Sequence, residues 1–139
     1  MWGVTPAALK TLYRSYVSCL NARDWDRLGR FIDQAVIHNG QPLGLTGYRN
    51  MLQKDVLAIP DLHFEIEMLI TEPPDLAARL RFDCTPAATF MGLPVEGRHL
   101  TFCENVFYRF GDDRIAEVWS IVDKAAIEAQ LAGRTAIEI

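Results

Sequence analysis

Two polar residues, Glu104 and Ser120, interrupt apolar rows in the stretch from residue 98 to residue 123. Side chains alternate in polarity on both sides of Gly111-Asp112-Asp113, which predicts two long strands joined by a tight turn. The row of Glu104 is otherwise Leu100, Phe102, Val106, Tyr108 and Phe110, and the row of Ser120 is otherwise Ala116, Val118 and Val122. A polar group on a core-facing row needs a hydrogen-bond partner or a function, so these two residues are the first candidates for chemistry.

A carboxylate at position 104 is suited to general base catalysis. Desolvation raises a carboxyl pKa towards neutrality, which favours removal of a proton next to a carbonyl group. Two alternatives stay open: a β-bulge turns Glu104 outwards, or an arginine such as Arg79 or Arg81 neutralises it. Ser120 is most simply a pocket-lining hydroxyl. A serine hydroxyl acts as a base only when another group takes its proton, and the sequence places no histidine near Ser120 to do so.

Three further side chains are candidates to contact a ligand. Tyr16 lies on the apolar stripe of the first predicted helix, where its phenol can orient a ligand oxygen, whereas Tyr13 on the same stripe is assigned to the core. His38 and Asn39 precede Gly40 in an irregular segment. This pair either donates hydrogen bonds into a pocket or forms part of an exposed loop.

Metal binding is not predicted, and neither is a cofactor. The three histidines, His38, His63 and His99, have no second ligand at a helical or strand spacing, and the last two are expected to be spectators. The three cysteines, Cys19, Cys84 and Cys103, lie far apart in apolar elements, which indicates buried free thiols.

Helices are predicted at the start of the chain. The first begins at Thr5-Pro6 and ends near Asn21, because a hydroxyl cap and a proline both suit a helix start. Asp24 is predicted to cap a second, short helix with Trp25, Leu28, Phe31 and Ile32 inward, fading before Val36. Residues 36–45 are broken by glycine and proline and predict an irregular strand or a lining loop.

Long strands are predicted after a third helix. This helix is capped by Thr46 and ended by Pro60. The period then changes to two, which predicts strands over residues 62–68 and 76–85 before the hairpin of residues 98–123. Asp123 is expected to cap a last helix.

This order predicts one α+β domain over residues 1–139, in which a curved antiparallel sheet wraps around three helices. Strands separated only by turns cannot make the crossovers of a parallel sheet. Such an arrangement encloses an apolar pocket between sheet and helices, where small ligands commonly bind.

Composition excludes several classes of protein. Half of the residues are apolar and 23% are charged, which is typical of a globular chain. The net charge is −4 and the basic residues are scattered, so nucleic acid is not an expected partner. No apolar run approaches the roughly 20 residues of a membrane span, and no export signal is recognisable, so a cytoplasmic protein is expected.

The sequence resembles the SnoaL-like polyketide cyclase family, also called ester cyclases, of the nuclear-transport-factor-2-like superfamily. The resemblance is carried by Ala77-Ala78-Arg79-Leu80, Cys84-Thr85-Pro86-Ala87-Ala88, Phe90-Met-Gly-Leu-Pro-Val-Glu-Gly-Arg98, Val106-Phe-Tyr-Arg109 and Glu117-Val-Trp-Ser-Ile-Val-Asp123. Weaker matches upstream extend it over nearly the whole chain. It implies a cone of three helices against a strongly bent antiparallel sheet, a short C-terminal helix, and a homodimer formed through the outer face of the sheet.

The family resemblance also implies intramolecular aldol closure, with an aspartate as general acid and base and a histidine on the neighbouring strand. Those two positions are Ser120 and Val106 here, and the family's Thr-His pair is Thr85-Pro86. Glu104 lies two residues from the family's histidine position on the same strand face, where it is a candidate substitute base.

The expected function is therefore cyclase- or isomerase-type proton transfer on a small apolar carbonyl compound. The alternative is a non-catalytic ligand-binding or interaction protein, and a limonene-epoxide-type hydrolase is disfavoured because no Asp/Arg/Asp set can be assembled. The expected pocket is lined by Tyr16, His38, Asn39, Phe82, Phe102, Val106 and Val118.

Overall fold

The structure is a computed structural model, and it describes residues 4–133. In chain order the elements are α1 (Pro6–Asn21), the 3₁₀-helix η1 (Trp25–Arg30), β1 (Ile32–His38), α2 (Gly44–Ala58), β2 (Glu65–Glu72), β3 (Asp75–Cys84), β4 (Thr89–Phe90), β5 (Leu93–Pro94), β6 (Leu100–Gly111), β7 (Arg114–Val122) and α3 (Lys124–Leu131). The predicted α+β class is confirmed.

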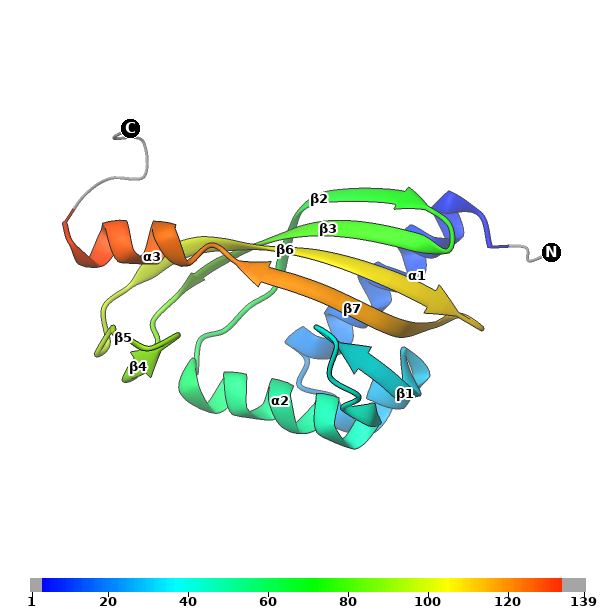
Figure 1. Cartoon of the computed structure of the whole chain (residues 1–139), viewed down its shortest axis with the longest axis horizontal. Coiled ribbons are helices and arrows are strands. Elements are labelled where there is room, and N and C mark those ends of the chain that lie inside the picture. The colour runs from blue at the N-terminus through cyan, green and yellow to red at the C-terminus, as the bar shows by residue number, and fades with distance from the viewer. Residues whose placement is uncertain (1–3, 134–139) are drawn as a thin grey trace.

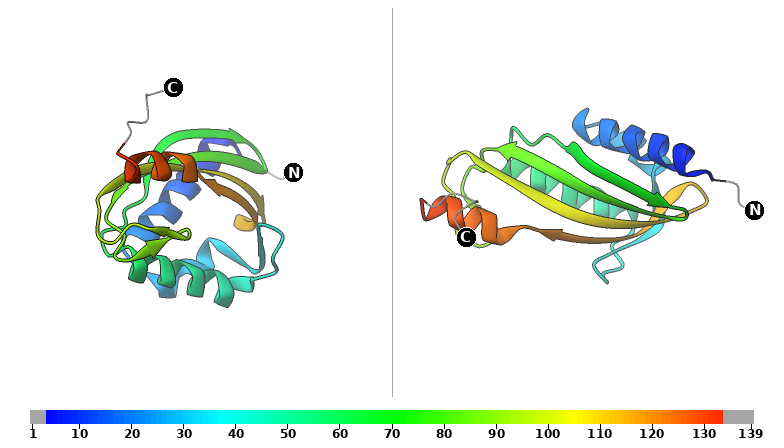
Figure 2. Two further views of the ribbon diagram at one scale, coloured as in Figure 1. Left: turned by 60° about the vertical axis from the view of Figure 1, so that its left-hand side comes forward. Right: turned by 90° about the horizontal axis from the view of Figure 1, so that it is seen from above.

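The main sheet has the strand order β1-β7-β6-β3-β2. Figure 1 shows β7, β6, β3 and β2 side by side, with α1 and α2 on one side of them and α3 where β7 ends. The other views show how strongly the sheet curves over the two long helices (Figure 2). The side chains that face inward from α1, α2 and the concave side of the sheet form one hydrophobic core.

The segment after η1 differs from the prediction. The expected second helix is a 3₁₀-helix that ends at Arg30, and Ile32 lies in a strand. This strand, β1, runs parallel to β7, so the sheet is mixed and not wholly antiparallel. Ile32 is fully buried beside its partner Ile115, and the Ile115 amide donates to the Phe31 carbonyl at 2.7 Å. Pairing with a distant strand has overridden a local helical pattern.

The predicted helix starts are partly correct. The Thr5 hydroxyl accepts from the Ala8 amide at 3.0 Å, and the Asp123 carboxylate accepts from the Ala126 amide at 3.1 Å, so these two predicted caps are confirmed. Asp24 precedes η1 but makes no side-chain cap, so that prediction is wrong. Thr46, however, lies inside α2, which begins at Gly44 after a residue that makes no side-chain cap. Gly44 has a φ of 67°, a left-handed conformation that suits glycine, so backbone geometry sets this start.

The hairpin of β6 and β7 matches the predicted alternation on its first strand. Every apolar residue in the row of Glu104 is buried. The pairing with β7 shifts register between Arg109 and Phe110 of β6: Arg109 pairs with Glu117, and Phe110 pairs with Ile115. The extra residue in this bulge brings Ile115, not the predicted Ala116, into the buried row with Val118.

Candidate acid-base site

Glu104 lies in the middle of β6 and belongs to the row that faces the helices. Its neighbours across the sheet are Leu80 on β3 and Val122 on β7. The pairing is continuous at this point, so no bulge turns Glu104 outwards. Arg79 and Arg81 pair instead with Glu67 at 3.6 Å and Glu65 at 3.8 Å. Both alternatives to an inward, unpaired carboxyl are therefore wrong.

The surroundings of Glu104 favour its neutral form. Burial raises the pKa of Glu104 to about 7, the Ser120 hydroxyl opposes this rise, and the negative charge of Asp55 adds to it. Within residues 4–133, Glu104 has no ion pair with a basic side chain. Its side chain is still partly reached by water. A carboxyl group with these properties can exchange protons near neutral pH.

Ser120 has a histidine beside it, which the sequence had not indicated. The Oγ atom of Ser120 lies 3.4 Å from Nε2 of His38. His38 reaches this place because it ends β1 and pairs with Val118, two residues before Ser120. Burial lowers the pKa of the His38 imidazole, which keeps the ring neutral near pH 7.

Asn39 is exposed at the end of β1, and its side chain holds the backbone of Ser120. Its Oδ1 accepts from the Ser120 amide at 2.8 Å, and its Nδ2 donates to the Ser120 carbonyl at 3.2 Å. The backbone amide of Asn39 also donates to the Val118 carbonyl at 2.9 Å. The residue therefore extends the pairing of β1 with β7 and positions His38 and Ser120.

Four buried tyrosines bring hydroxyl groups into the interior. The hydroxyls of Tyr16 and Tyr48 lie 2.7 Å apart, and those of Tyr13 and Tyr108 lie 2.9 Å apart. Burial raises the pKa of all four phenols, so they stay protonated. Each pair has two hydroxyl hydrogens, and the bond within the pair uses one of them. The Tyr48 ring also meets the His38 ring edge to face, with centroids 6.0 Å apart.

Asp55 on α2 is a second acidic residue that the sequence analysis missed. It follows Tyr48 by seven positions and Leu52 by three, so it lies on the same side of α2 as these buried residues, although it is itself exposed. Its side chain stays accessible to water, but the surrounding protein excludes enough solvent to raise its pKa to about 6. The sequence did contain a signal for Asp55, because it is an acidic residue at helical spacing from apolar ones. Glu104 was recognised in the same way, as an acidic residue in an apolar row of a strand.

We predict that Asp55→Asn lowers the pKa of Glu104. The variant removes a negative charge that disfavours ionisation of Glu104. Titration of the Glu104 carboxyl carbon by NMR measures this directly, and Asp26→Asn on η1 is a matched surface control. An unchanged or raised Glu104 pKa in Asp55→Asn would contradict the prediction.

The apolar residues of the predicted pocket lie together on the concave side. Phe82, Phe102, Val106 and Val118 are each less than 5% exposed, and the rings of Phe82 and Phe102 have centroids 5.4 Å apart. They form a packed apolar floor beneath the polar groups. Two hollows on the molecule lie elsewhere, on the outer face of the sheet and at the end of the β6–β7 hairpin.

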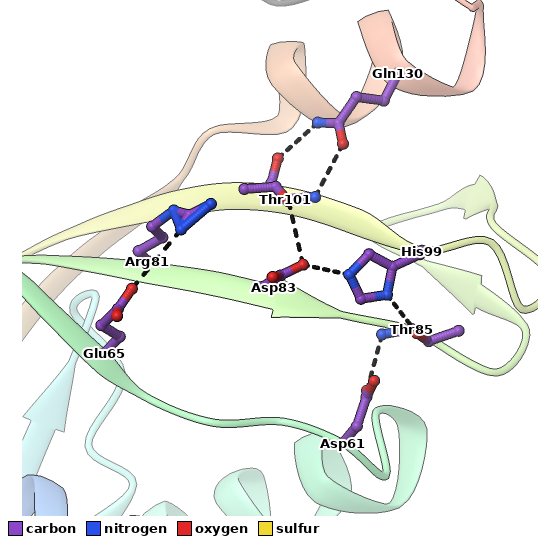
Figure 3. A network of polar contacts seen from close by, with 8 residues as sticks. All are labelled: Asp61, Glu65, Arg81, Asp83, Thr85, His99, Thr101 and Gln130. Carbon is purple, nitrogen blue, oxygen red and sulfur yellow. Dashed lines mark hydrogen bonds and ion pairs between the residues drawn. The ribbon is translucent and has the colours of Figure 1, made fainter.

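A separate polar network joins the ends of β3 and β6 to α3 (Figure 3). His99 contacts Asp83 through Nε2 and Thr85 through Nδ1, the latter at 2.9 Å. Gln130 of α3 accepts from the Thr101 amide at 2.9 Å and donates to its carbonyl at 2.6 Å. His99 therefore has hydrogen-bond partners within this network. Within the described chain, no group of three His, Cys, Asp or Glu residues could hold a metal ion.

The strongly curved sheet and the two long helices beneath it define a domain of the nuclear-transport-factor-2-like class. The family profile described as SnoaL-like polyketide cyclase matches residues 10–131. The chain therefore belongs to the SnoaL-like polyketide cyclase family.

Solved structures agree with this assignment. A SnoaL-like polyketide cyclase from Agrobacterium tumefaciens is 54% identical, with a TM-score of 0.88 over 88% of this chain and 97% of that one. TsrD from Streptomyces laurentii and IdmH from Streptomyces antibioticus share the fold at 20% and 22% identity. Their TM-scores are 0.81 and 0.77, over 93% and 89% of this chain and 98% of each of theirs. No curated protein matches the chain. None of the helices among residues 4–133 is long and apolar enough to span a membrane.

Proposed function

We propose that this protein catalyses cyclase- or isomerase-type proton transfer on a small, largely apolar carbonyl compound, with Glu104 as the base. The observation that carries the proposal is an inward carboxyl group without a cationic partner among the described residues, whose pKa burial raises to about 7. An unpaired carboxyl in the interior destabilises a fold, and such groups occur preferentially at functional sites.

The reaction needs a base and a hydrogen-bond donor. Glu104 removes the proton from the carbon next to the carbonyl group, and the electron pair of that C–H bond moves into an enolate. The Tyr16–Tyr48 pair supports the second role, because its unused hydroxyl hydrogen is available to the enolate oxygen. Both phenols keep their protons at neutral pH because burial raises their pKa.

Glu104 and His38 stand close to the positions that the family resemblance assigns to its catalytic pair. These positions, Ser120 and Val106, are direct partners across β7 and β6. Glu104 is the next residue along the inward face of β6, and His38 contacts Ser120. We infer that the acidic group comes from β6 instead of β7, two residues from the family's histidine position, and that the imidazole comes from β1.

The rival function is ligand binding without catalysis. It would be favoured by a Glu104 that is tied to an arginine or that faces a filled cavity. Neither of the two hollows named above is lined by Glu104, but both nearby arginines pair with other glutamates on the outer face. The contacts of Glu104 therefore support the catalytic proposal.

Hydrogen exchange at the α-carbon of methyl acetoacetate tests the proposal. The protein is incubated with the ester in heavy water, and proton NMR follows loss of the α-hydrogen signal. We expect exchange well above the rate in buffer alone, with saturation as the ester concentration rises. Exchange at the buffer rate for this compound and for bulkier, more apolar β-dicarbonyl compounds would count against a catalytic role.

We also propose that the protein is a homodimer joined through the outer face of the sheet. Ile70, Ala77, Phe107 and Trp119 are successive cross-strand partners over β2, β3, β6 and β7. Ile70 and Phe107 are 58% and 60% exposed, and the next row adds the exposed Met68 and Ile121. The first row, from Ile70 to Trp119, lines a hollow of about 370 Å³. The Arg109 guanidinium lies 5.6 Å from the centroid of the Trp119 ring. An apolar patch of this kind, bordered by charged side chains, is typical of a protein interface.

Phe107→Glu should convert the dimer to a monomer. The substitution places one charge from each subunit in the buried centre of the contact, where an unpaired charge is strongly unfavourable. Light scattering coupled to size exclusion measures the mass. Leu57→Glu is the matched control, because Leu57 is 80% exposed on α2, away from the sheet. A Phe107→Glu protein that keeps the mass of the wild type would contradict an interface at this face.

A further inference from the structure

We propose that Ser120 and His38 form a proton relay that connects Glu104 to water. This inference rests on the proposed role of Glu104 as the base. The three residues lie on three adjacent strands, β6, β7 and β1. Glu104 pairs with Val122 and His38 pairs with Val118, so Ser120 lies midway between their partners along β7. Alternate residues of a strand share one face, which places the serine hydroxyl between the carboxyl and the imidazole.

The local contacts hold the relay in place. The Asn39 side chain binds both backbone groups of Ser120, and the Ser120 hydroxyl remains free to face Glu104 on one side and His38 on the other. The Tyr48 ring packs against the His38 ring and limits its rotation. A hydroxyl has one hydrogen to donate and two lone pairs, so it can accept a proton from one neighbour while it releases its own to the other.

The proton step is balanced. After Glu104 has taken a proton from the substrate carbon, its O–H bond breaks and that proton bonds to the Ser120 oxygen. The original Ser120 O–H bond breaks at the same time, and its proton bonds to Nε2 of neutral His38. Glu104 is again a carboxylate, Ser120 is again a hydroxyl, and His38 is an imidazolium that passes its proton to water. The reverse sequence delivers a proton from water to Glu104.

The other titratable groups near the relay are acidic or phenolic. They are Asp55 and Tyr48 on α2, Tyr13 and Tyr16 on α1, and Tyr108 on β6. Among residues 4–133, neither Glu104 nor His38 belongs to an ion pair. The partly accessible imidazole of His38 is therefore placed to exchange protons with solvent.

NMR titration of the imidazole proton on Cε1 of His38 tests the coupling without a substrate. In the wild type we expect a second inflection near the pKa of Glu104, because strongly interacting sites titrate together. This inflection should disappear in Ser120→Ala and in Glu104→Gln. The signals of His63 and His99, which lie outside the relay, serve as internal references. A His38 curve that is identical in all three proteins would overturn the relay.

An optically active α-methyl acetoacetate ester in heavy water tests the relay during turnover. Racemisation counts each formation of the enolate, and uptake of deuterium counts proton exchange with solvent. Ser120→Ala and His38→Asn should lower the ratio of exchange to racemisation by about three- to tenfold while racemisation continues. An unchanged ratio in both variants overturns the relay and leaves the proposed function intact. If Glu104→Gln racemises the ester as fast as the wild type, the proposed function itself is wrong.

Discussion

Replacing Glu104 with glutamine should lower kcat/KM for proton transfer by about 100- to 10,000-fold, the range that a positioned general base contributes. Glutamine keeps the size and hydrogen-bonding shape of the side chain but cannot accept the proton. The pKa of about 7 means that the wild-type rate should rise with pH through neutrality as Glu104 ionises. Exchange of the α-hydrogen, measured against pH, gives both results from one assay.

Glu65→Gln is the matched control for this experiment. Glu65 lies on β2 and pairs with Arg81 at the exposed side of the sheet, so its replacement tests the effect of losing a carboxylate outside the proposed site. We expect Glu65→Gln to retain the wild-type rate. A Glu104→Gln protein with activity within about threefold of the wild type would remove Glu104 from the mechanism, because a base contributes far more than that.

The same carboxyl group should make the folded protein less stable in alkaline than in acidic buffer. Glu104 has an ordinary pKa of 4.5 in the unfolded chain and about 7 in the folded protein. Below pH 4.5 it is neutral in both states and has no effect. As pH rises from 4.5 through 7, the unfolded chain loses its proton more readily, so the free energy of unfolding falls.

The corresponding difference is roughly 3 kcal/mol at most, and partial access of water reduces it. Glu104→Gln should therefore stabilise the protein by about 1–3 kcal/mol near pH 8 and change its stability little near pH 4, where Glu104 is protonated in both states. Urea unfolding of both proteins at the two pH values measures the effect. Equal stabilisation at both pH values would show that packing, and not ionisation, is responsible.

These two expectations describe one compromise. A carboxyl group held in an apolar surrounding lowers the stability of the fold above its pKa, and the same surrounding makes it a better base near neutral pH. Replacement of Glu104 should consequently raise stability while it removes activity.

Much of the fold could be predicted from local sequence pattern. Alternating polarity predicted the β6–β7 hairpin and placed Glu104 on its inward row, and both the Thr5 and the Asp123 caps were correct. Local chemistry was sufficient here, because the period of a strand and the amide partners of a helix start depend on residues close in the chain. The register shift between Arg109 and Phe110 was not predictable, since the bulge that causes it leaves no mark in the composition of the strand.

The surroundings of Glu104 depended on contacts between distant segments. His38 reaches Ser120, 82 residues away, only because β1 pairs with β7 in parallel, and the helical pattern around Ile32 had hidden that strand. Tyr16 and Tyr48 meet at their hydroxyls from two different helices.

By itself, the sequence determined the inward carboxyl, the Thr5 and Asp123 caps and the class of fold, because each follows from the spacing of neighbouring residues. The tertiary structure alone decided that Glu104 has no arginine partner among the described residues, that Ser120 lies near it, and that His38 contacts Ser120. A carboxyl pKa depends on the charges, hydrogen bonds and solvent around it, and for Glu104 these include Ser120 on β7 and Asp55 on α2, which only folding brings to β6.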